Sequence, residues 1–309
     1  MDRSRTVLLR KANLAAVPPG IAGRAELESL NLDLNQLASL PAWLGGLAGL
    51  RELSLYGNRL AELPDSLWRL ALLETLNLAD NRLATLADGI GGLAALRMLD
   101  LGHNQLERLP DALGGLRSLR FLYLSDNQLT ELPASLGDLR SLIYLSATDN
   151  QLERLPDALG GLAALVELRL YGNRLAALPD GIGGLAALRE LHAMHNQLTS
   201  LPDAIGRLAA LRKLILQGNR LTALPETIGD LAALTDLDLR DNALERLPES
   251  VGGLAALRFL DLRANRLAAL PESLRGLAAL EKLDLRWNHE LTPPAWLGEL
   301  AGRGCVVYC

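Results

Sequence analysis

The stretch "LRELSLYGNRLAELP", Leu50 to Pro64, changes its periodicity halfway. Leu53 and Leu55 alternate with polar neighbours, which is typical of a β-strand with one buried face. After Asn58 the leucines follow at three-residue spacing up to Pro64, and an acidic residue comes next. Proline at the first helical position and an acid in the first turn both favour a short helix. The stretch therefore predicts a strand, a turn and a brief helical or 3-10 segment.

The same pattern recurs along the chain with a period of 23 residues and no insertion. Its asparagine is found at positions Asn35, Asn58, Asn81, Asn104, Asn127, Asn150, Asn173, Asn196, Asn219, Asn242, Asn265 and Asn288. A unit this short cannot bury its own apolar face, so the units are expected to stack into one solenoid over residues 1–309. A carboxamide both donates and accepts hydrogen bonds, so we expect the asparagines to satisfy the backbone of successive turns as a ladder.

The pattern Leu-x-x-Leu-x-Leu-x-x-Asn-x-Leu-x-x-Leu-Pro resembles the typical, 23-residue class of the leucine-rich repeat family. The resemblance implies an α/β solenoid, a horseshoe with a parallel β-sheet on the concave face and short helical or 3-10 segments on the convex face. It divides the chain into an N-terminal capping rung (1–26), twelve repeats with the asparagine ladder (27–288) and a C-terminal cap (289–309), where "RGCVVYC" is expected to form a last strand. It also implies a binding scaffold rather than an enzyme.

Composition narrows the class of protein. The net charge of −5, from 31 basic and 36 acidic residues, is too balanced to indicate a nucleic-acid or membrane surface. The N-terminal segment lacks the apolar core of a secretory signal, and no stretch reaches the roughly 20 apolar residues of a membrane span. Cys305 and Cys309 are too far apart along one strand for a disulfide. We therefore expect a cytoplasmic protein with free thiols, and the Ala/Gly/Leu/Arg-rich composition suggests a bacterial gene.

The repeat register assigns a face to each strand residue. In the repeat above, Leu53 and Leu55 point inward, while Glu52, Ser54 and Tyr56 point onto the concave sheet. Six of the 11 aromatic residues of the chain (4 Trp, 5 Tyr, 2 Phe) fall on such outward positions, and most of these lie in the central repeats. Either they are there because aromatic residues favour strands, or they form a patch that binds a partner.

We take the second interpretation as the leading hypothesis. The predicted partner-binding residues are Met98, Phe121, Tyr123, Tyr144, Thr148, Arg169, Tyr171, His192, Met194 and His195. No cofactor or metal is expected, because His192 and His195 point to different faces and no third ligand accompanies them at metal-binding spacing.

Two further features remain open from the sequence. Ala147 and Ala193 each replace an inward leucine in the central repeats. Either neighbouring side chains shift to fill the space, or the smaller residues adjust the shape of the sheet beneath the patch. The late repeats carry columns of aspartate (Asp238, Asp261, Asp284) beside columns of arginine (Arg240, Arg263, Arg286). These charges either neutralise one another or form a rim that orients a partner.

No phosphate-binding loop or hydrolase nucleophile is recognisable, and the 21 residues after Asn288 are too few for a catalytic domain. The sequence thus predicts a non-enzymatic scaffold, monomeric, that binds a protein partner on the aromatic concave face. Two alternatives are a bacterial effector that occupies a host protein and a self-associating structural protein, for example a homodimer.

Overall fold

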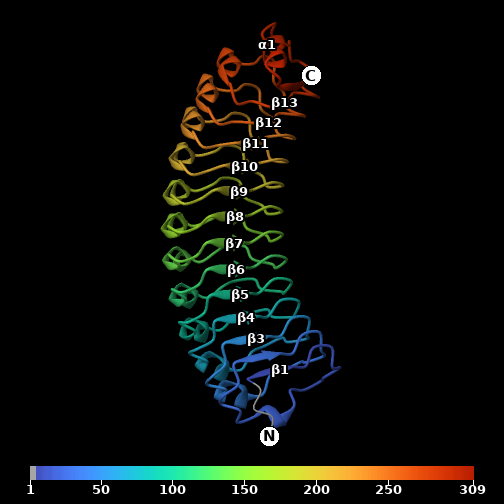
Figure 1. The fold of residues 1–309 in the computed structure, drawn as a ribbon, viewed down its shortest axis with the longest axis vertical. Coiled ribbons are helices and arrows are strands. Elements are labelled where there is room, and N and C mark those ends of the chain that lie inside the picture. Colours follow the sequence, from blue (N-terminus) through green and yellow to red (C-terminus); the bar gives the residue numbers. More distant parts are fainter. Residues whose placement is uncertain (1–4) are drawn as a thin grey trace. The chain divides into compact units, whose positions relative to one another are not determined.

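The computed structural model describes residues 5–309. The chain forms two compact units, unit 1 up to Gln151 and unit 2 from Leu152 to Cys309. The capping rung predicted for 1–26 lies in unit 1, with residues 1–4 outside the described part. Figure 1 shows the repeated elements in chain order.

Unit 1 contains seven parallel strands paired in sequence order. Its strands are β1 (Thr6–Leu8), β2 (Ser29–Asn31), β3 (Glu52–Ser54), β4 (Thr75–Asn77), β5 (Met98–Asp100), β6 (Phe121–Tyr123) and β7 (Tyr144–Ser146). Its 3-10 helices are η1 (Pro19–Ile21), η2 (Ala42–Gly46), η3 (Asp65–Arg69), η4 (Asp88–Gly92), η5 (Asp111–Gly115) and η6 (Ala134–Asp138).

Unit 2 repeats this arrangement, again with parallel strands paired in sequence order. Its strands are β8 (Glu167–Arg169), β9 (Glu190–His192), β10 (Lys213–Ile215), β11 (Asp236–Asp238), β12 (Phe259–Asp261), β13 (Lys282–Asp284) and β14 (Val306–Tyr308). Its helices are η7 (Asp157–Gly161), η8 (Asp180–Gly184), η9 (Asp203–Arg207), η10 (Glu226–Asp230), η11 (Glu249–Gly253), η12 (Glu272–Gly276) and α1 (Leu297–Gly302).

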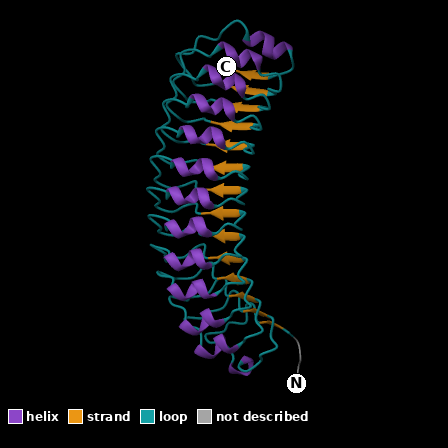
Figure 2. Ribbon diagram, turned by 90° about the vertical axis from the view of Figure 1, so that its left-hand side faces the viewer, coloured by secondary structure: helices purple, strands orange, loops and turns teal. Residues whose placement is uncertain are grey.

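Within each unit the strands form one layer and the helices another (Figure 2). The buried residues of both units are mostly leucines. The inward leucines, such as Leu53 and Leu55, are 0% exposed, which confirms the predicted register. The strand pairs keep the 23-residue offset, for example Met98 with Phe121 and Phe121 with Tyr144. The outward positions of each sheet, called the strand face below, therefore line up in columns across the repeats.

The asparagine ladder is confirmed. Asn127 accepts a hydrogen bond from the backbone N–H of Leu106 in the preceding repeat (3.0 Å) and donates to the carbonyls of Leu101 (3.0 Å) and Leu124 (3.1 Å). The residue before each of the twelve ladder asparagines has a positive φ, between 51° and 69°. Glycine, aspartate and histidine dominate this position because they tolerate the left-handed conformation better than most residues.

Two local predictions need correction. The repeat proline lies one residue before the helix, since Pro64 has an extended backbone (φ −71°, ψ 142°) and η3 begins at Asp65. In the C-terminal cap, the expected strand is β14, but the α-helix α1 that precedes it was not predicted. β14 joins β13 with an offset of 24 residues, Lys282 pairing with Val306, because α1 replaces the usual 3-10 segment.

Candidate binding surfaces

The strand face of unit 1 carries a cluster of large side chains. Met98, Phe121 and Tyr144 occupy one column across β5, β6 and β7, and Tyr123 lies in the next column. All four side chains are half-buried, and we call them the aromatic surface. The rings of Tyr123 and Tyr144 contact each other, with centroids 5.1 Å apart and planes at 39°.

The aromatic surface is held by the core beneath it. Leu99, Leu122 and Leu145 alternate with the surface residues along the same strands, and all three are 0% exposed. A ring on a packed strand has few rotamers, and a tilted pair at this distance is in the favourable range for aromatic contacts. The register therefore presents a rigid, partly apolar area.

Small polar side chains adjoin this surface. The hydroxyls of Ser125 and Ser146 form a hydrogen bond of 2.8 Å. Ser146 is 4% exposed and Thr148 is 2% exposed. Thr148, one of the predicted contact residues, thus lies below the surface and offers a partner almost no accessible area.

A half-buried carboxylate that the sequence reasoning missed lies beside the aromatic surface. Asp100 is the register partner of Tyr123 and shares β5 with Met98. Burial raises the pKa of Asp100, and the hydrogen bond from the N–H of Gly102 (3.0 Å) only partly opposes this effect. The signal available in the sequence was glycine at position 102, where late repeats carry arginine.

In unit 2, two of the predicted contact residues belong to a charge network on the strand face. Arg169 pairs with Glu167 (Nε–Oε1 2.5 Å), and Nε2 of His192 lies 3.1 Å from Oε2 of Glu190. Lys213 also pairs with Glu190, at 3.0 Å. Burial alone would raise the pKa of Glu190, but the hydrogen bonds with Lys213 and His192 lower it overall.

The network brings possible metal ligands together. One ligand atom from each of Glu167, Glu190 and His192 lies within 4.8 Å of the others, although no third ligand was expected near His192. The glutamates come from neighbouring repeats, so linear spacing did not reveal them. Arg169 and Lys213 already neutralise both carboxylates, which favours a structural charge network.

The other predicted residues of unit 2 do not join this network. Tyr171 and Met194 are half-buried on the strand face, while His195 is exposed at the turn with a φ of 52°. A Cβ atom placed on Gly218 would lie 2.6 Å from Nδ1 of His195, so the imidazole covers the next turn. The position of His195 therefore has a local conformational explanation.

The aspartate and arginine columns of unit 2 pair with each other. Each aspartate contacts the arginine two residues later, at 3.2 Å for Asp238–Arg240 and 2.6 Å for both Asp261–Arg263 and Asp284–Arg286. Asp284 is 0% exposed, and Arg263 reaches it as well, at 3.5 Å. This geometry favours the self-neutralising interpretation.

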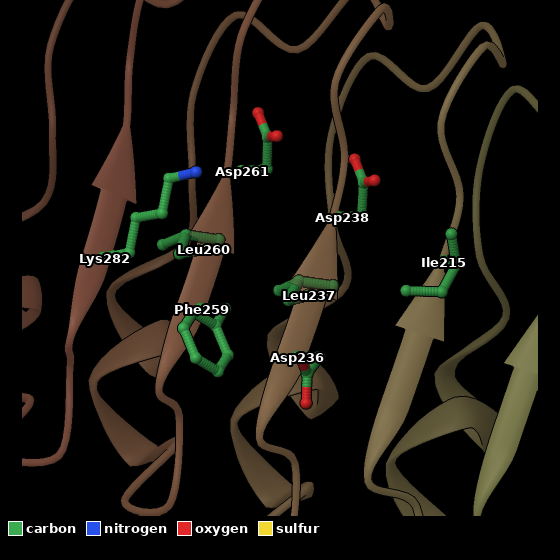
Figure 3. A pocket seen from close by; sticks show the side chains of 8 residues that line it. All are labelled: Ile215, Asp236, Leu237, Asp238, Phe259, Leu260, Asp261 and Lys282. Atoms are coloured by element: carbon green, nitrogen blue, oxygen red, sulfur yellow. The ribbon is translucent and has the colours of Figure 1, made fainter. Parts of the chain in front are cut away.

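A pocket of about 200 Å³ lies over β10–β13 on the same face. In Figure 3 the carboxylates of Asp238 and Asp261 point in the same direction, and Phe259 and Asp236 lie at the other end. The full lining consists of Ile215, Asp236, Leu237, Asp238, Phe259, Leu260, Asp261 and Lys282. Because Arg240 and Arg263 already pair with two of these acids, the pocket offers little uncompensated charge.

Ala147 and Ala193 both point inward and are 0% exposed. In their repeats the ladder bond to the same-repeat carbonyl is 3.3 Å, for Asn150 to Ala147 and for Asn196 to Ala193. The corresponding bond to a leucine carbonyl is shorter, for example 2.9 Å from Asn173 to Leu170. A small local shift of the turn thus accompanies each alanine.

The two cysteines are unpaired, with Cys305 buried and Cys309 exposed. Desolvation raises the pKa of both thiols, and at Cys309, where the removal from water is partial, the negative charge of Asp284 adds to it. A raised pKa lowers thiol reactivity near neutral pH. Within residues 5–309, no helix is long and apolar enough to cross a membrane.

Comparisons with known proteins identify the family. A family model described as "Leucine-rich repeat region" matches residues 94–204 and 196–301, and one described as "Leucine rich repeat" matches residues 25–83. The chain therefore belongs to the leucine-rich repeat family, and the predicted fold class is confirmed. No curated protein matches the chain.

Several solved structures are similar. A leucine-rich repeat protein of Leptospira interrogans is 35% identical with a TM-score of 0.86, covering 96% of this chain and 76% of that one. The plant peptide hormone receptor RGFR1, solved in complex with RGF2, is 29% identical with a TM-score of 0.69, covering 88% of this chain and 49% of the receptor. The Arabidopsis receptor kinase HAESA, in complex with the peptide hormone IDA and the co-receptor SERK1, is 29% identical with a TM-score of 0.70, covering 93% of this chain and 57% of that one.

Proposed function

We propose that the chain is a non-enzymatic interaction module that binds a protein partner through the aromatic surface of unit 1. Leucine-rich repeat proteins are generally protein-interaction modules, and the similar plant receptors RGFR1 and HAESA were solved in complex with RGF2 and with the peptide hormone IDA, respectively. The observation that carries the proposal is the Tyr123–Tyr144 contact at 5.1 Å on a rigid strand face.

Physical reasons support this choice of surface. Partly exposed aromatic side chains that need no reordering lose little entropy on binding, and such residues dominate the energetics of interfaces. The column of Met98, Phe121 and Tyr144 carries no charge, as is typical of the desolvated centre of an interface. Arg97 lies at the margin and is already paired with Glu74 (3.5 Å).

The proposal is tested with the double variant Tyr123→Ala/Tyr144→Ala of the intact chain. Partners are captured on the wild-type protein, and the affinity of each purified partner is then measured by calorimetry. Removing two anchors is expected to weaken binding by about 30-fold or more, which corresponds to about 2 kcal/mol. A matched control is Tyr56→Ala/Phe259→Ala, which removes two aromatic residues from the strand faces outside the aromatic surface.

Equal affinity of the wild type and the Tyr123/Tyr144 variant for every captured partner would exclude this surface as the binding site. Self-association is distinguished by light scattering over a concentration series, because a dimer would raise the average mass. The expected cytoplasmic location belongs to the same proposal and is tested by cell fractionation. A secretion assay in the source organism separates the effector alternative from a resident scaffold.

A further inference from the structure

Four aspartates occupy the same position of the repeat, at the end of the strand on the strand face: Asp100, Asp238, Asp261 and Asp284. In unit 2 each of these carboxylates is paired with the arginine two residues later. The motif Asp-Leu-Arg thus supplies a carboxylate together with its own counter-ion.

Asp100 lacks this internal counter-ion, because its motif is Asp-Leu-Gly. Among residues 5–309, no arginine or lysine forms an ion pair with it, and its carboxylate accepts one hydrogen bond, from the N–H of Gly102. The nearby His103 is turned to Asp126, with Nδ1 3.4 Å from the carboxylate. A half-buried carboxylate of this kind is an incompletely satisfied acceptor.

The backbone does not require glycine at position 102. Gly102 is absent from the described residues with positive φ, unlike Gly57 or Gly172 at the turns. A Cβ atom at this position would lie 3.3 Å from Oδ1 of Asp100, a close contact that a small shift of the carboxylate would relieve. Glycine leaves open the space that Arg240, Arg263 and Arg286 occupy in the other three repeats.

The open carboxylate borders aromatic residues. Tyr123 is its register partner on β6, and Met98 and Phe121 lie one column away. A guanidinium group pairs with a carboxylate through its edge and stacks its flat face on an aromatic ring. An ammonium group is compact and strongly hydrated, so it gains less from the same surroundings.

We propose that the aromatic surface receives an arginine side chain of its protein partner, which pairs with Asp100 and stacks beside Tyr123. This inference rests on the proposed function and names the chemistry of the partner. The partner's guanidinium takes the place that an internal arginine takes in the late repeats.

The pKa of these aspartates depends on how closely an arginine engages the carboxylate. Burial raises the pKa of Asp238 although Arg240 contacts it at 3.2 Å, so the direction of the shift alone does not distinguish a paired aspartate from an unpaired one. Burial raises the pKa of Asp100, although the hydrogen bond from Gly102 and the charge of His103 act against this effect. Burial also acts on Asp284, but hydrogen bonds from Arg286 outweigh it and lower that pKa. A partner's arginine would relieve the desolvation of Asp100 in the same way.

The test selects peptides from a random linear display library on the intact protein and on three single variants. Asp100→Asn removes the charge, and Gly102→Arg supplies the internal counter-ion of the late repeats. Asp238→Asn is the matched control, because it removes an aspartate at the same repeat position that already has a partner. Thermal unfolding of each variant verifies that it is folded.

We expect peptides selected on the wild type and on Asp238→Asn to be enriched in arginine at one position. Selection on Asp100→Asn or Gly102→Arg should abolish that enrichment. In a selected peptide, replacing this arginine by citrulline should weaken binding to the wild type by about tenfold or more, and replacement by lysine should weaken it less. The citrulline effect should vanish on Asp100→Asn.

Two outcomes separate this inference from the proposed function. If the selected peptides show no arginine enrichment but lose their binding to Tyr123→Ala/Tyr144→Ala, the arginine inference is overturned. The aromatic surface then remains the binding site. Arginine-rich peptides that bind this double variant as well as the wild type would overturn both. Unchanged enrichment on Asp100→Asn, or no selection above the naive library on the wild type, would also overturn the arginine inference.

Discussion

Replacement of one ladder asparagine provides the sharpest test of how this fold is stabilised. Asn127 is 8% exposed, and its Oδ1 accepts the N–H of Leu106 at 3.0 Å. Its Nδ2 donates to the carbonyls of Leu101 and Leu124, and at 3.2 Å to that of Ser125. In Asn127→Ala all of these side-chain bonds are lost, and the site is too enclosed for water to replace them freely.

The consequences differ between the backbone groups, because the ladder overlaps. The carbonyl of Leu101 still accepts from Asn104 (3.1 Å), and that of Leu124 still accepts from Asn150 (2.9 Å). The carbonyl of Ser125 likewise keeps the N–H of His103 as a donor (2.8 Å). The N–H of Leu106 has no second partner in the described chain. An orphaned buried N–H costs about 1–3 kcal/mol, and the loss of one donor at the shared carbonyls adds about 1 kcal/mol, so we expect a loss of about 2–4 kcal/mol.

Urea unfolding measures this loss, with Gln128→Ala as the control because Gln128 is exposed next to the ladder. The control should stay within about 0.5 kcal/mol of the wild type. Hydrogen exchange locates the effect: the Leu106 amide should exchange faster, while the Leu129 amide, bonded to Asn150 at 3.0 Å, should remain protected. A loss below about 1 kcal/mol, or equal acceleration of both amides, would refute the reasoning.

Three further predictions follow from burial and charge. Asp100→Asn should stabilise the fold at neutral pH, because the raised pKa of Asp100 means that its charged form is destabilised in the folded state. This gain in stability should shrink as the pH falls through the raised pKa towards the ordinary value of 3.8. Urea titrations at several pH values measure the gain, and a gain that stays constant with pH would contradict the prediction. Asp284→Asn should destabilise the fold by about 1–3 kcal/mol at neutral pH, because it removes bonds to Arg286. Since the pKa of Asp284 is lowered, this difference should begin to shrink as the pH falls through 3.8 and should vanish only below the lowered folded pKa. Its persistence in stronger acid would point to packing instead. Ala147→Leu should destabilise the fold by about 1–3 kcal/mol, because the turn shift leaves no room for the larger side chain. An increase in the midpoint of thermal unfolding would contradict this and reveal a void.

Much of the fold follows from local sequence because every repeat meets the same surroundings. The alternation around Leu53 and Leu55 sets the buried face, and the unbroken 23-residue period carries that assignment to each strand. The exceptions lie where the pattern ends or where one residue decides a boundary. Helix α1 interrupts the repeat near the C-terminus, and the proline defines the residue before the 3-10 helix rather than its first position.

The candidate site was likewise predictable from the sequence only in part. Register alone predicted that Phe121, Tyr123 and Tyr144 share one face of unit 1, and the structure has them there, although their role in binding stays a prediction. Thr148 shares the strand face by register, yet it is only 2% exposed. Exposure depends on how side chains from different repeats lean, which periodicity does not determine.

Sequence by itself determined the repeat, the inward leucines, the ladder and the columns of the strand face, because all of these depend on a period that each unit repeats. Only the tertiary structure decided which charges are paired. Glu190 meets His192 and Lys213, whereas no arginine or lysine pairs with Asp100 within residues 5–309. The physical reason is that an ion pair depends on distances of a few ångströms between side chains of neighbouring strands, and those distances exist only once the repeats have stacked.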